Sequence, residues 1–388
     1  MFGTKRTYLD WAASAPVSRA ALRAFDTVVK IYGNPSSPHS EGVQARALLD
    51  DARATIAALM ETKQDGIIFT SGATEANNLA LQGHVRTLQK KGVDDIHILY
   101  LSSVHASLHE GIHALDGIDV EPLKLTNGRI DLAYLAAQLR PQTRLVLVDA
   151  VCGETGTVYD TRGVRNVLEA YARENKTERA LLHVDASQAL LVRPHDLTRL
   201  AADTASLDAQ KVGGVRGIGI LAKRSNVELA PLMHGGAQEG GLRPGTEPVA
   251  LAAAFAAALT EAAENREAFV ARAVEMRARL LKRTADIPGL GVNQGKEGVP
   301  HIVNLSLPGR DTDYAVMLLD KEGFAVSTKS ACEADSEEGS RAVLALTGDE
   351  ARAKSTLRIS WGPPTKARDL DRFADALIRT VTFLDSGV

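Results

Sequence analysis

The sequence predicts an α/β protein built on a mainly parallel sheet, and two observations carry this prediction. Short apolar runs alternate with helical segments through the middle of the chain, and these runs lack the strict alternation of a half-exposed strand. Such strands are typical of a sheet covered by helices on both faces. Polar residues also follow several of the runs, as expected where the carboxyl ends of parallel strands form a binding edge.

The large unit is predicted from five apolar runs in the first two thirds of the chain. The predicted strands are residues 67–69, 96–101, 145–148, 181–184 and 218–221. After the first run, Thr70-Ser71-Gly72 leads into a helix that begins near Ala73. The polar residues at the strand ends are 71–74, 103–105, Asp149, Asp185 and 208–211. We expect these residues to lie along one edge of the sheet.

A second, smaller unit is predicted in the C-terminal part of the chain. An alanine-rich helical pattern runs from about Glu247 to about Ala285, which is longer than a usual globular helix. Beyond it, strands are expected at 301–307 and 356–360, and helices at 313–322 and 367–384. We therefore predict a large domain of residues 16–260 and a small α+β domain formed by residues 1–15 and 261–388.

Composition narrows the class of protein. The chain has 388 residues, of which 45% are hydrophobic and 24% are charged, as in ordinary globular proteins. A net charge of −3 gives no support for direct nucleic-acid binding, and no apolar run approaches the roughly 20 residues of a membrane span. The two cysteines cannot form a disulfide framework, and the N-terminus lacks a signal-peptide pattern, so we expect a cytoplasmic location. No metal site is predicted.

Three features at the predicted strand ends could carry chemistry. Lys211 follows a strand-like stretch, where a lysine can form a Schiff base, although a surface lysine is the commoner interpretation. Asp185 could pair with a protonated pyridine nitrogen or simply cap a helix. Residues 71–75 open a helix whose free N–H groups, with the Thr74 hydroxyl, could bind phosphate or form a capping box.

The order and spacing of these features resemble the pyridoxal-phosphate cysteine desulfurases of the nitrogen-fixation and iron–sulfur-assembly type, within the class V aminotransferase group. The segments that carry the resemblance are 8–10, 33–36, 70–80, His105, 183–188, Lys211, 233–239, 243–246, 327–332 and Arg358. They span essentially the whole chain. The resemblance implies the type I fold of pyridoxal-phosphate-dependent transferases, in which a smaller α+β domain accompanies the large sheet domain.

The same resemblance implies roles at the cofactor ring. Lys211 would hold pyridoxal phosphate through a Schiff base. His105 would stack on the ring and assist proton transfer. Asp185 would pair with the ring nitrogen, and Gln188 would bond the phenolic oxygen.

Further roles concern the cofactor phosphate and the substrate. Ala73 and Thr74 would bind the phosphate, and Thr246 would reach the phosphate in the partner subunit, which implies a homodimer. Arg358 would hold the carboxylate of L-cysteine, for which the planar guanidinium is well suited, with Asn34 assisting.

Cys332 would be the nucleophile that takes sulfur from L-cysteine. The products would be L-alanine and a persulfide, whose sulfur passes to a sulfur-acceptor or iron–sulfur scaffold protein or into tRNA thiolation. The polar, flexible neighbours of Cys332 suit a free thiol, although an incidental exposed thiol is the alternative on the residues alone. Cys152 is interpreted as a structural thiol.

Three positions depart from the family pattern, in which asparagine, serine and histidine contact the cofactor. Gly153 replaces the asparagine, and Asp208 and Gln210 replace the serine and the histidine, both of which touch the phosphate. Two unit charges about 4 Å apart interact by about 4 kcal/mol at an effective dielectric constant near 20. Asp208 could therefore point away from the phosphate, be protonated, or be neutralised by a cation such as Arg216. We expect the first, with Gln210 donating a hydrogen bond to the phosphate.

Two alternative functions stay open on the sequence. The chain could be another class V pyridoxal-phosphate enzyme, an aminotransferase or a lyase, which needs no nucleophilic thiol. It could also be a weakly active desulfurase-like scaffold, because the phosphate-binding residues are altered.

Overall fold

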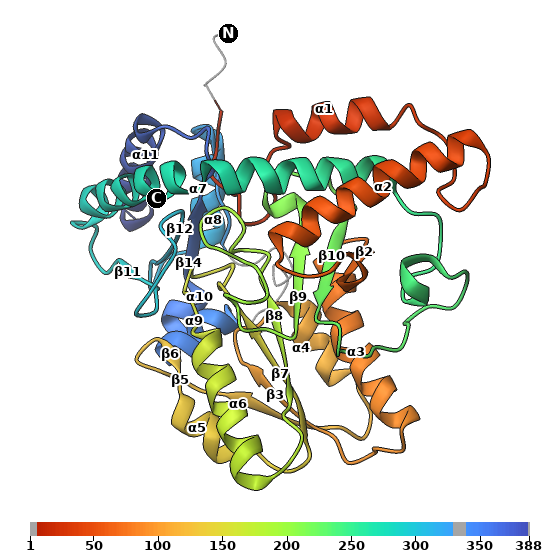
Figure 1. Cartoon of the computed structure of the whole chain (residues 1–388). Helices are drawn as coiled ribbons and strands as arrows, with labels where there is room; N and C mark the ends of the chain where they lie inside the picture. Colours follow the sequence, from red (N-terminus) through yellow and green to blue (C-terminus); the bar gives the residue numbers. More distant parts are fainter. Residues whose placement is uncertain (1–5, 329–338, 387–388) are drawn as a thin grey trace.

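The centre of the molecule is a seven-stranded sheet with the strand order β2-β10-β9-β8-β7-β3-β4 (Figure 1). The computed structural model describes residues 6–328 and 339–386. The strands of this sheet are β2 (Ile67–Thr70), β3 (His97–Leu101), β4 (Asp119–Leu123), β7 (Thr143–Asp149), β8 (Leu181–Asp185), β9 (Thr204–Asp208) and β10 (Gly219–Lys223). β10 pairs antiparallel with both of its neighbours, and the other neighbouring strands pair parallel. The predicted mainly parallel sheet is confirmed.

Helices cover this sheet and bury its strands. All residues of β2, β3 and β9 are buried, which explains why the sequences of β2 and β3 do not alternate strictly between apolar and polar residues. α3 (Ala73–Lys90) packs on β2, β8, β9 and β10 and also contacts α4 (Ala106–His113). α1 (Arg19–Val28) and α2 (Ser40–Leu59) pack against α7, and α5 (Leu132–Gln138) packs against α6 (Thr161–Asn175).

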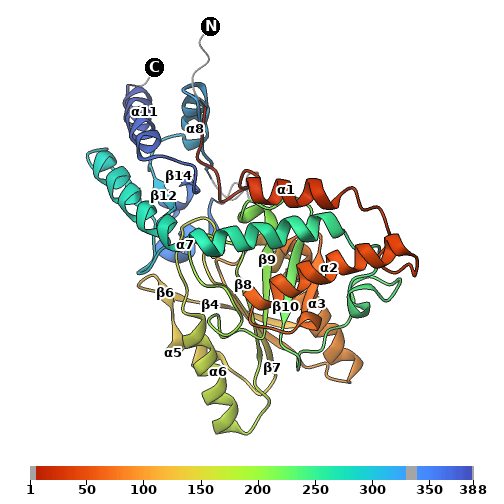
Figure 2. The same cartoon turned by 45° about the horizontal axis from the view of Figure 1, so that its top comes forward.

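The smaller unit is built on an antiparallel sheet of β11 (Gly291–Val292), β12 (Ile302–Ser306) and β14 (Thr356–Ser360). Its helices are α8 (Thr312–Lys321), α9 (Arg341–Thr347), α10 (Glu350–Lys354) and α11 (Ala367–Asp385). α7 (Val249–Thr284) runs unbroken for 36 residues from the large sheet to this unit (Figure 2). The predicted long helix is therefore confirmed, and the predicted domain boundary at residue 260 lies inside it.

The N-terminal residues join the smaller unit. β1 (Thr7–Tyr8) pairs parallel with β13 (Phe324–Ala325), and Asp10 forms a bridge with Ser360 of β14. This pairing supports the proposed assignment of residues 1–15 to the small domain, whose exact limits stay a prediction. The remaining short elements are β5 (Leu125–Thr126), β6 (Arg129–Ile130), η1 (Gln64–Gly66), η2 (Ala209–Lys211) and η3 (Gln238–Gly241).

Elements that the sequence did not predict lie at the periphery. β4 is an edge strand with polar residues and Pro122, a composition that an edge tolerates but that hides the strand signal. α1 and α2 both precede β2, the first strand of this sheet in the chain, so no neighbouring apolar run indicates them. Among residues 6–328 and 339–386, none of the helices combines the length and the apolar character that crossing a bilayer requires.

A buried ion pair fixes the segment that precedes α7 to the sheet. Arg53 of α2 bonds both carboxylate oxygens of Glu239 in η3, at 2.8 and 2.7 Å. Glu239 Oε2 also accepts the backbone N–H of Phe69 in β2 at 2.8 Å, and the Arg53 guanidinium lies over the Phe69 ring. The Glu239 side chain is only 1% exposed, so Arg53 and the Phe69 N–H, rather than water, stabilise its negative charge.

Removing one partner of this pair should destabilise the fold strongly. Glu239→Ala leaves the Arg53 charge largely buried without a counter-ion, and we expect the free energy of unfolding to fall by about 3–5 kcal/mol in urea titrations. As a control, Glu228→Ala removes the exposed partner of Lys91 and should change the unfolding free energy little. Equal effects of the two substitutions would contradict the structural role of Glu239.

Candidate active site

A cavity of about 260 Å³ lies at the carboxyl ends of the parallel strands. The ends of β7, β8 and β9 contribute Asp149, Asp185 and Asp208 to its wall, and Lys211 follows on η2. Arg358 of β14 closes the cavity from the smaller unit. The predicted clustering of polar strand ends, with Asp185 and Lys211 facing one pocket between the two units, is therefore confirmed.

Lys211 is held in the cavity by the N-terminal segment. Its Nζ atom donates to the backbone oxygens of Ala12 and Ala13, at 2.9 and 2.8 Å. Both alanines also line the cavity. These carbonyls stabilise the amine at one position, from which it can meet a carbonyl group of a bound molecule.

Asp185 is oriented by hydrogen bonds to both carboxylate oxygens. Oδ2 accepts from Asn77 Nδ2 of α3 at 2.8 Å, and Oδ1 accepts from the backbone N–H of Ser187 at 3.0 Å. Asn77 is fully buried, and its Nδ2 also donates to Ser107 Oγ at 2.9 Å. Asn77 lies within a segment that carries the family resemblance, but its role was not predicted. The available signal was its spacing: Asn77 comes four residues after Ala73, so both lie on the same face of the helix.

The Asn77 amide also determines the tautomer of His183 in β8. Asn77 Nδ2 donates to Asp185, so its Oδ1 is the acceptor, and His183 Nε2, 2.9 Å away, must be the donor. His183 Nδ1 then accepts from Thr204 Oγ1 at 2.9 Å. Burial lowers the pKa of His183, and the nearby Asp185 offsets this only in part. The neutral His183 imidazole therefore holds the Asn77 amide in the orientation in which its Nδ2 donates to Asp185.

His105 lies at the start of α4 on the cavity wall. Its Nδ1 accepts the backbone N–H of Ser107 at 3.2 Å and lies 2.8 Å from Ser107 Oγ. The residue is exposed, and its imidazole lines the cavity. Through Ser107 and Asn77, His105 is linked to Asp185, so the cap that begins α4 also orients a predicted catalytic side chain.

Asp149 is a second acid beside Asp185. The two residues are paired in the parallel register of β7 and β8, so their side chains lie on the same face. Asp149 is 5% exposed, and its Oδ1 has no partner among the described groups. Burial, and then the charge of Asp185, raise the pKa of Asp149 well above its usual value, which favours its protonated form. The sequence placed Asp149 at a strand end without making it a site residue.

Asp208 points towards the start of α3, whereas we expected it to point away from a phosphate bound there. Its Oδ2 accepts the backbone N–H of Ala73 at 3.1 Å, and its Oδ1 accepts the N–H of Gln210 at 3.1 Å. Gln210 Nε2 lies 3.5 Å from Asp208 Oδ2. The backbone N–H groups of the first turn at Ala73 and Thr74 attract the nearest anion, and Asp208 provides it. Arg216, a possible neutralising cation, instead donates to Ser14.

Gln188 covers the position left open by Gly153. Its Nε2 donates to the Ala12 carbonyl at 2.9 Å, and a Cβ atom added to Gly153 would lie 3.1 Å from the same Nε2. A side chain at position 153 therefore requires Gln188 to shift. The Gln188 amide thus lies next to Gly153, the residue that replaces the asparagine of the family.

Arg358 is deeply buried at the interface of the two units. Its Nη2 pairs with Asp10 Oδ1 at 2.8 Å, and its Nη1 donates to the Gly153 carbonyl at 3.2 Å. The side chain is 3% exposed, so Asp10 compensates most of its charge. The guanidinium borders the cavity, where a substrate carboxylate can approach it.

Asn34 and Thr246 do not line the cavity of their own chain. Both are exposed, and Asn34 Nδ2 lies 3.5 Å from Thr246 Oγ1. This position differs from that of the other predicted site residues. It is compatible with the expectation that Thr246 reaches a cofactor in a second subunit.

Cys332 lies outside the described residues. On one side of that segment, Ser327 pairs with Arg358 through two backbone hydrogen bonds, of 2.6 and 3.2 Å. On the other side, the Ser340 hydroxyl donates to Glu154 Oε2 at the cavity wall. The chain therefore leaves and re-enters the described structure beside the cavity. Cys152 is buried in the wall, and burial raises the pKa of its thiol to about 12, which supports its interpretation as a structural thiol.

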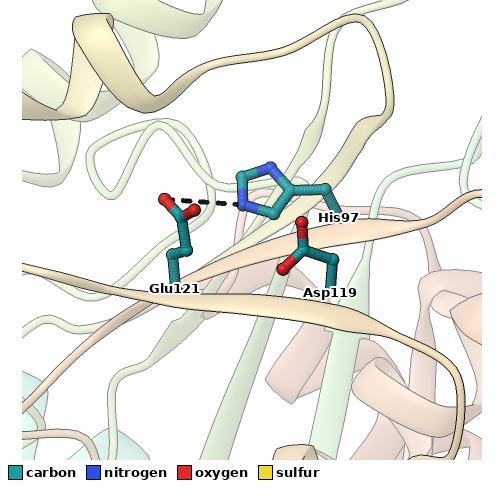
Figure 3. A group of neighbouring side chains, drawn as sticks. All are labelled: His97, Asp119 and Glu121. Atoms are coloured by element: carbon teal, nitrogen blue, oxygen red, sulfur yellow. Dashed lines mark ion pairs between the residues drawn. The ribbon is translucent and has the colours of Figure 1, made fainter.

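A second group of ionisable side chains lies at the opposite end of the sheet. His97, Asp119 and Glu121 bring ligand atoms within 4.8 Å of one another, and His97 Nε2 lies 4.0 Å from Glu121 Oε2 (Figure 3). Arg140 pairs with both carboxylates. Burial, and then Arg140, lower the pKa of His97. The Arg140 guanidinium therefore already balances the negative charge of Asp119 and Glu121, which a metal ion would otherwise do.

The residues around the cavity fit pyridoxal phosphate at its ring. A fixed carboxylate at Asp185, an amine at Lys211 and an aromatic side chain at His105 surround a space large enough for a pyridine ring. The start of α3 offers backbone donors for a phosphate, although Asp208 already uses the Ala73 N–H.

The buried His183 should make stability depend on pH. In the unfolded chain, histidine binds a proton as the pH falls through about 6.5, whereas folded His183 stays neutral to lower pH. The unfolded state then binds more protons, so the free energy of unfolding should fall as the pH drops below about 6.5. Urea titrations of His183→Gln should show a weaker loss between pH 7 and 5. The exposed control His234→Gln should keep the parent slope, and parallel slopes for the parent and His183→Gln would contradict this assignment.

Comparison with known proteins agrees with this geometry. The chain matches the class-V aminotransferase family over residues 7–373. A putative cysteine desulfurase, IscS 1, of Bacillus subtilis is 35% identical over 365 residues, which make up 92% of this chain and 94% of that protein. Cysteine desulfurase IscS 1 of Archaeoglobus fulgidus is 31% identical and covers 95% of each chain.

Solved structures give the same result for the fold. A NifS-like protein superposes with a TM-score of 0.89 at 27% identity, covering 98% of this chain and 100% of its own. DndA from Streptomyces lividans superposes with a TM-score of 0.74 at 30% identity, covering 92% of this chain and 100% of its own. The predicted type I fold and the predicted resemblance are confirmed. The chain belongs to the pyridoxal-phosphate-dependent class-V aminotransferase family and, within it, to the cysteine desulfurases.

Proposed function

We propose that this chain removes sulfur from L-cysteine, releases L-alanine and receives the sulfur on Cys332. The observation that carries the proposal is the convergence of Lys211 and Asp185 in one cavity that Arg358 closes from the smaller unit. An amine, a ring-pairing carboxylate and a carboxylate-binding guanidinium are the groups that an amino-acid substrate and pyridoxal phosphate require.

The chain's own residues have separate tasks around the reacting carbon. When bound, pyridoxal phosphate supplies an electron sink that stabilises negative charge at the substrate Cα. Asp185, held by Asn77 and the Ser187 N–H, orients and neutralises the protonated ring nitrogen. Lys211 would hold the cofactor, and its Nζ atom would move the proton at Cα, with His105 on the cavity wall as the second candidate base.

Arg358 positions the substrate through its carboxylate. The guanidinium is fixed by Asp10 and the Gly153 carbonyl, so its plane is already oriented before the substrate enters. Arg358 also forms two backbone hydrogen bonds with Ser327, five residues before Cys332 in the chain. A substrate carboxylate held by Arg358 would therefore lie close to Ser327, which supports Cys332 as the sulfur acceptor.

The sulfur transfer is a displacement at sulfur. The Cys332 thiolate forms a bond to the substrate sulfur while the substrate C–S bond breaks, and the electron pair of that bond stays on the carbon that becomes the methyl group of alanine after protonation. The product on the enzyme is a persulfide. An acceptor thiol of an iron–sulfur scaffold or a tRNA-thiolation protein then takes the outer sulfur.

We also propose that the enzyme acts as a homodimer in the cytoplasm. Thr246 lies on the exposed surface beside Asn34 and away from its own cavity, which supports a role at the cofactor of a second subunit. A reducing compartment keeps the nucleophilic thiol available between turnovers.

Cys332→Ser should abolish persulfide formation, because a hydroxyl at this position cannot accept sulfane sulfur. The variant should keep bound cofactor, since Lys211 is unchanged. Alanine formation from L-cysteine and alkylation of the persulfide followed by mass spectrometry measure the loss. In Cys152→Ala, the sulfur should still be found on Cys332. Alanine and sulfide production by Cys332→Ser at the parent rate would show that Cys332 is not the acceptor.

Lys211→Ala should remove the visible absorbance of lysine-bound pyridoxal phosphate, because Lys211 is the one lysine among the described residues that line the cavity. Lys223→Ala, on a strand away from the cavity, serves as the control and should keep the band. Absorbance spectra after gel filtration make the comparison. A retained band in Lys211→Ala would assign the covalent attachment to a different residue.

A further inference from the structure

The start of α3 carries a carboxylate of this chain where the proposed function requires a phosphate. Asp208 is 8% exposed, and its Oδ2 accepts the Ala73 N–H at 3.1 Å. A Cβ atom added to Gly72, the residue before the helix, would lie 3.1 Å from the same oxygen. The carboxylate therefore sits directly over the first turn of an 18-residue helix.

The position of Asp208 is fixed from its own side as well. Its second oxygen, Oδ1, accepts the Gln210 N–H at 3.1 Å, which begins the turn that carries Lys211. Among the described residues, no lysine or arginine forms an ion pair with Asp208. The two oxygens thus join α3 to η2 across the cavity wall, and the helix start compensates the charge.

A phosphate and this carboxylate compete for the same donor. The first turn of α3 is the predicted phosphate site, because Ala73 offers its backbone N–H and Thr74 its hydroxyl. While Asp208 accepts the Ala73 N–H, a phosphate at this turn loses one donor and meets a negative charge at hydrogen-bonding distance. Cofactor binding therefore requires the carboxylate to leave the turn.

We propose that Asp208 is a built-in occupant of the cofactor's phosphate subsite. In the cofactor-free chain it caps α3 and preserves the cavity, and on loading it is displaced by the phosphate. This inference rests on the proposed function, since it needs pyridoxal phosphate to bind with its phosphate at α3. It makes Asp208 a residue that determines how strongly the site distinguishes phosphorylated from unphosphorylated cofactor.

The test compares pyridoxal phosphate with pyridoxal, which lacks the phosphate. Asp208→Asn keeps the size and the oxygen acceptor but removes the charge. We expect its dissociation constant for pyridoxal phosphate to fall about tenfold, equivalent to about 1.4 kcal/mol, while that for pyridoxal stays within twofold. Titration by absorbance and by quenching of intrinsic fluorescence measures both constants. Asp208→Ser, a second and smaller substitution, should change the ratio in the same direction.

A cofactor-independent measurement uses inorganic phosphate. We expect phosphate to raise the melting temperature of the cofactor-free Asp208→Asn protein more than that of the parent. Without phosphate, the variant should melt lower than the parent, because the helix start loses its anion. The control Asp311→Asn alters the carboxylate that caps α8, whose Oδ1 accepts the Tyr314 N–H at 2.9 Å, and should leave both cofactor constants unchanged.

The outcomes separate this inference from the proposed function. If the parent binds pyridoxal phosphate at Lys211 but the ratio of the two constants is unchanged or lower in Asp208→Asn, Asp208 is not a competitor and the inference is overturned alone. If the parent shows neither the absorbance band nor fluorescence quenching with pyridoxal phosphate, the proposed cofactor site is overturned, and the inference with it.

Discussion

The carboxamide of Asn77 is the interaction on which the site depends. Its Nδ2 donates to Asp185 and Ser107, and its Oδ1 accepts from His183 and Ser206. All four hydrogen-bonding positions of one amide are used, in a fully buried place. Because the amide joins α3, α4, β8 and β9, its orientation links the helix that begins the phosphate site to the strand that ends in Asp185. A buried polar network that is fully satisfied specifies one arrangement, since every alternative leaves a group without a partner.

The fold was largely predictable because burial leaves a direct trace in the sequence. Strands such as β2 and β3 are buried along their whole length, so their sequences are short apolar runs, and α7 keeps a helical pattern over its whole length. The antiparallel direction of β10 was not predictable from its own apolar run. It follows from the tight return after η2, where Gly213 and Gly217 adopt positive φ angles of 84° and 95°. The direction of a strand depends on the loop that leads into it, and an apolar run alone does not show the course of that loop.

The candidate site was predictable only for residues whose chemistry is unusual where they stand. Lys211 and Asp185 are charged residues at the ends of buried strands, and that position indicates function. Asn77 and Asp149 were not assigned. The helical spacing of Asn77 indicated only its face, because its importance comes from hydrogen bonds to other elements, and that of Asp149 comes from the parallel register that places it beside Asp185. The contact of Asp208 with the start of α3 was not predicted, because repulsion from a phosphate was considered and attraction to the N–H of Ala73 was not.

The continuity of α7 limits how the two units can move. A helix of 36 residues is about 54 Å long, and Figure 2 shows it spanning from the large sheet to the smaller unit. One part packs on α1 and α2, and another on α11, where Arg279 and Arg283 pair with Asp371 and Asp375. Swinging the smaller unit outward would bend this rod and break hydrogen bonds along it, because no proline interrupts it. The continuous helix therefore holds the two units, and with them Arg358 and the strand ends, at a fixed separation, so the width of the cavity is set by the fold before any ligand binds.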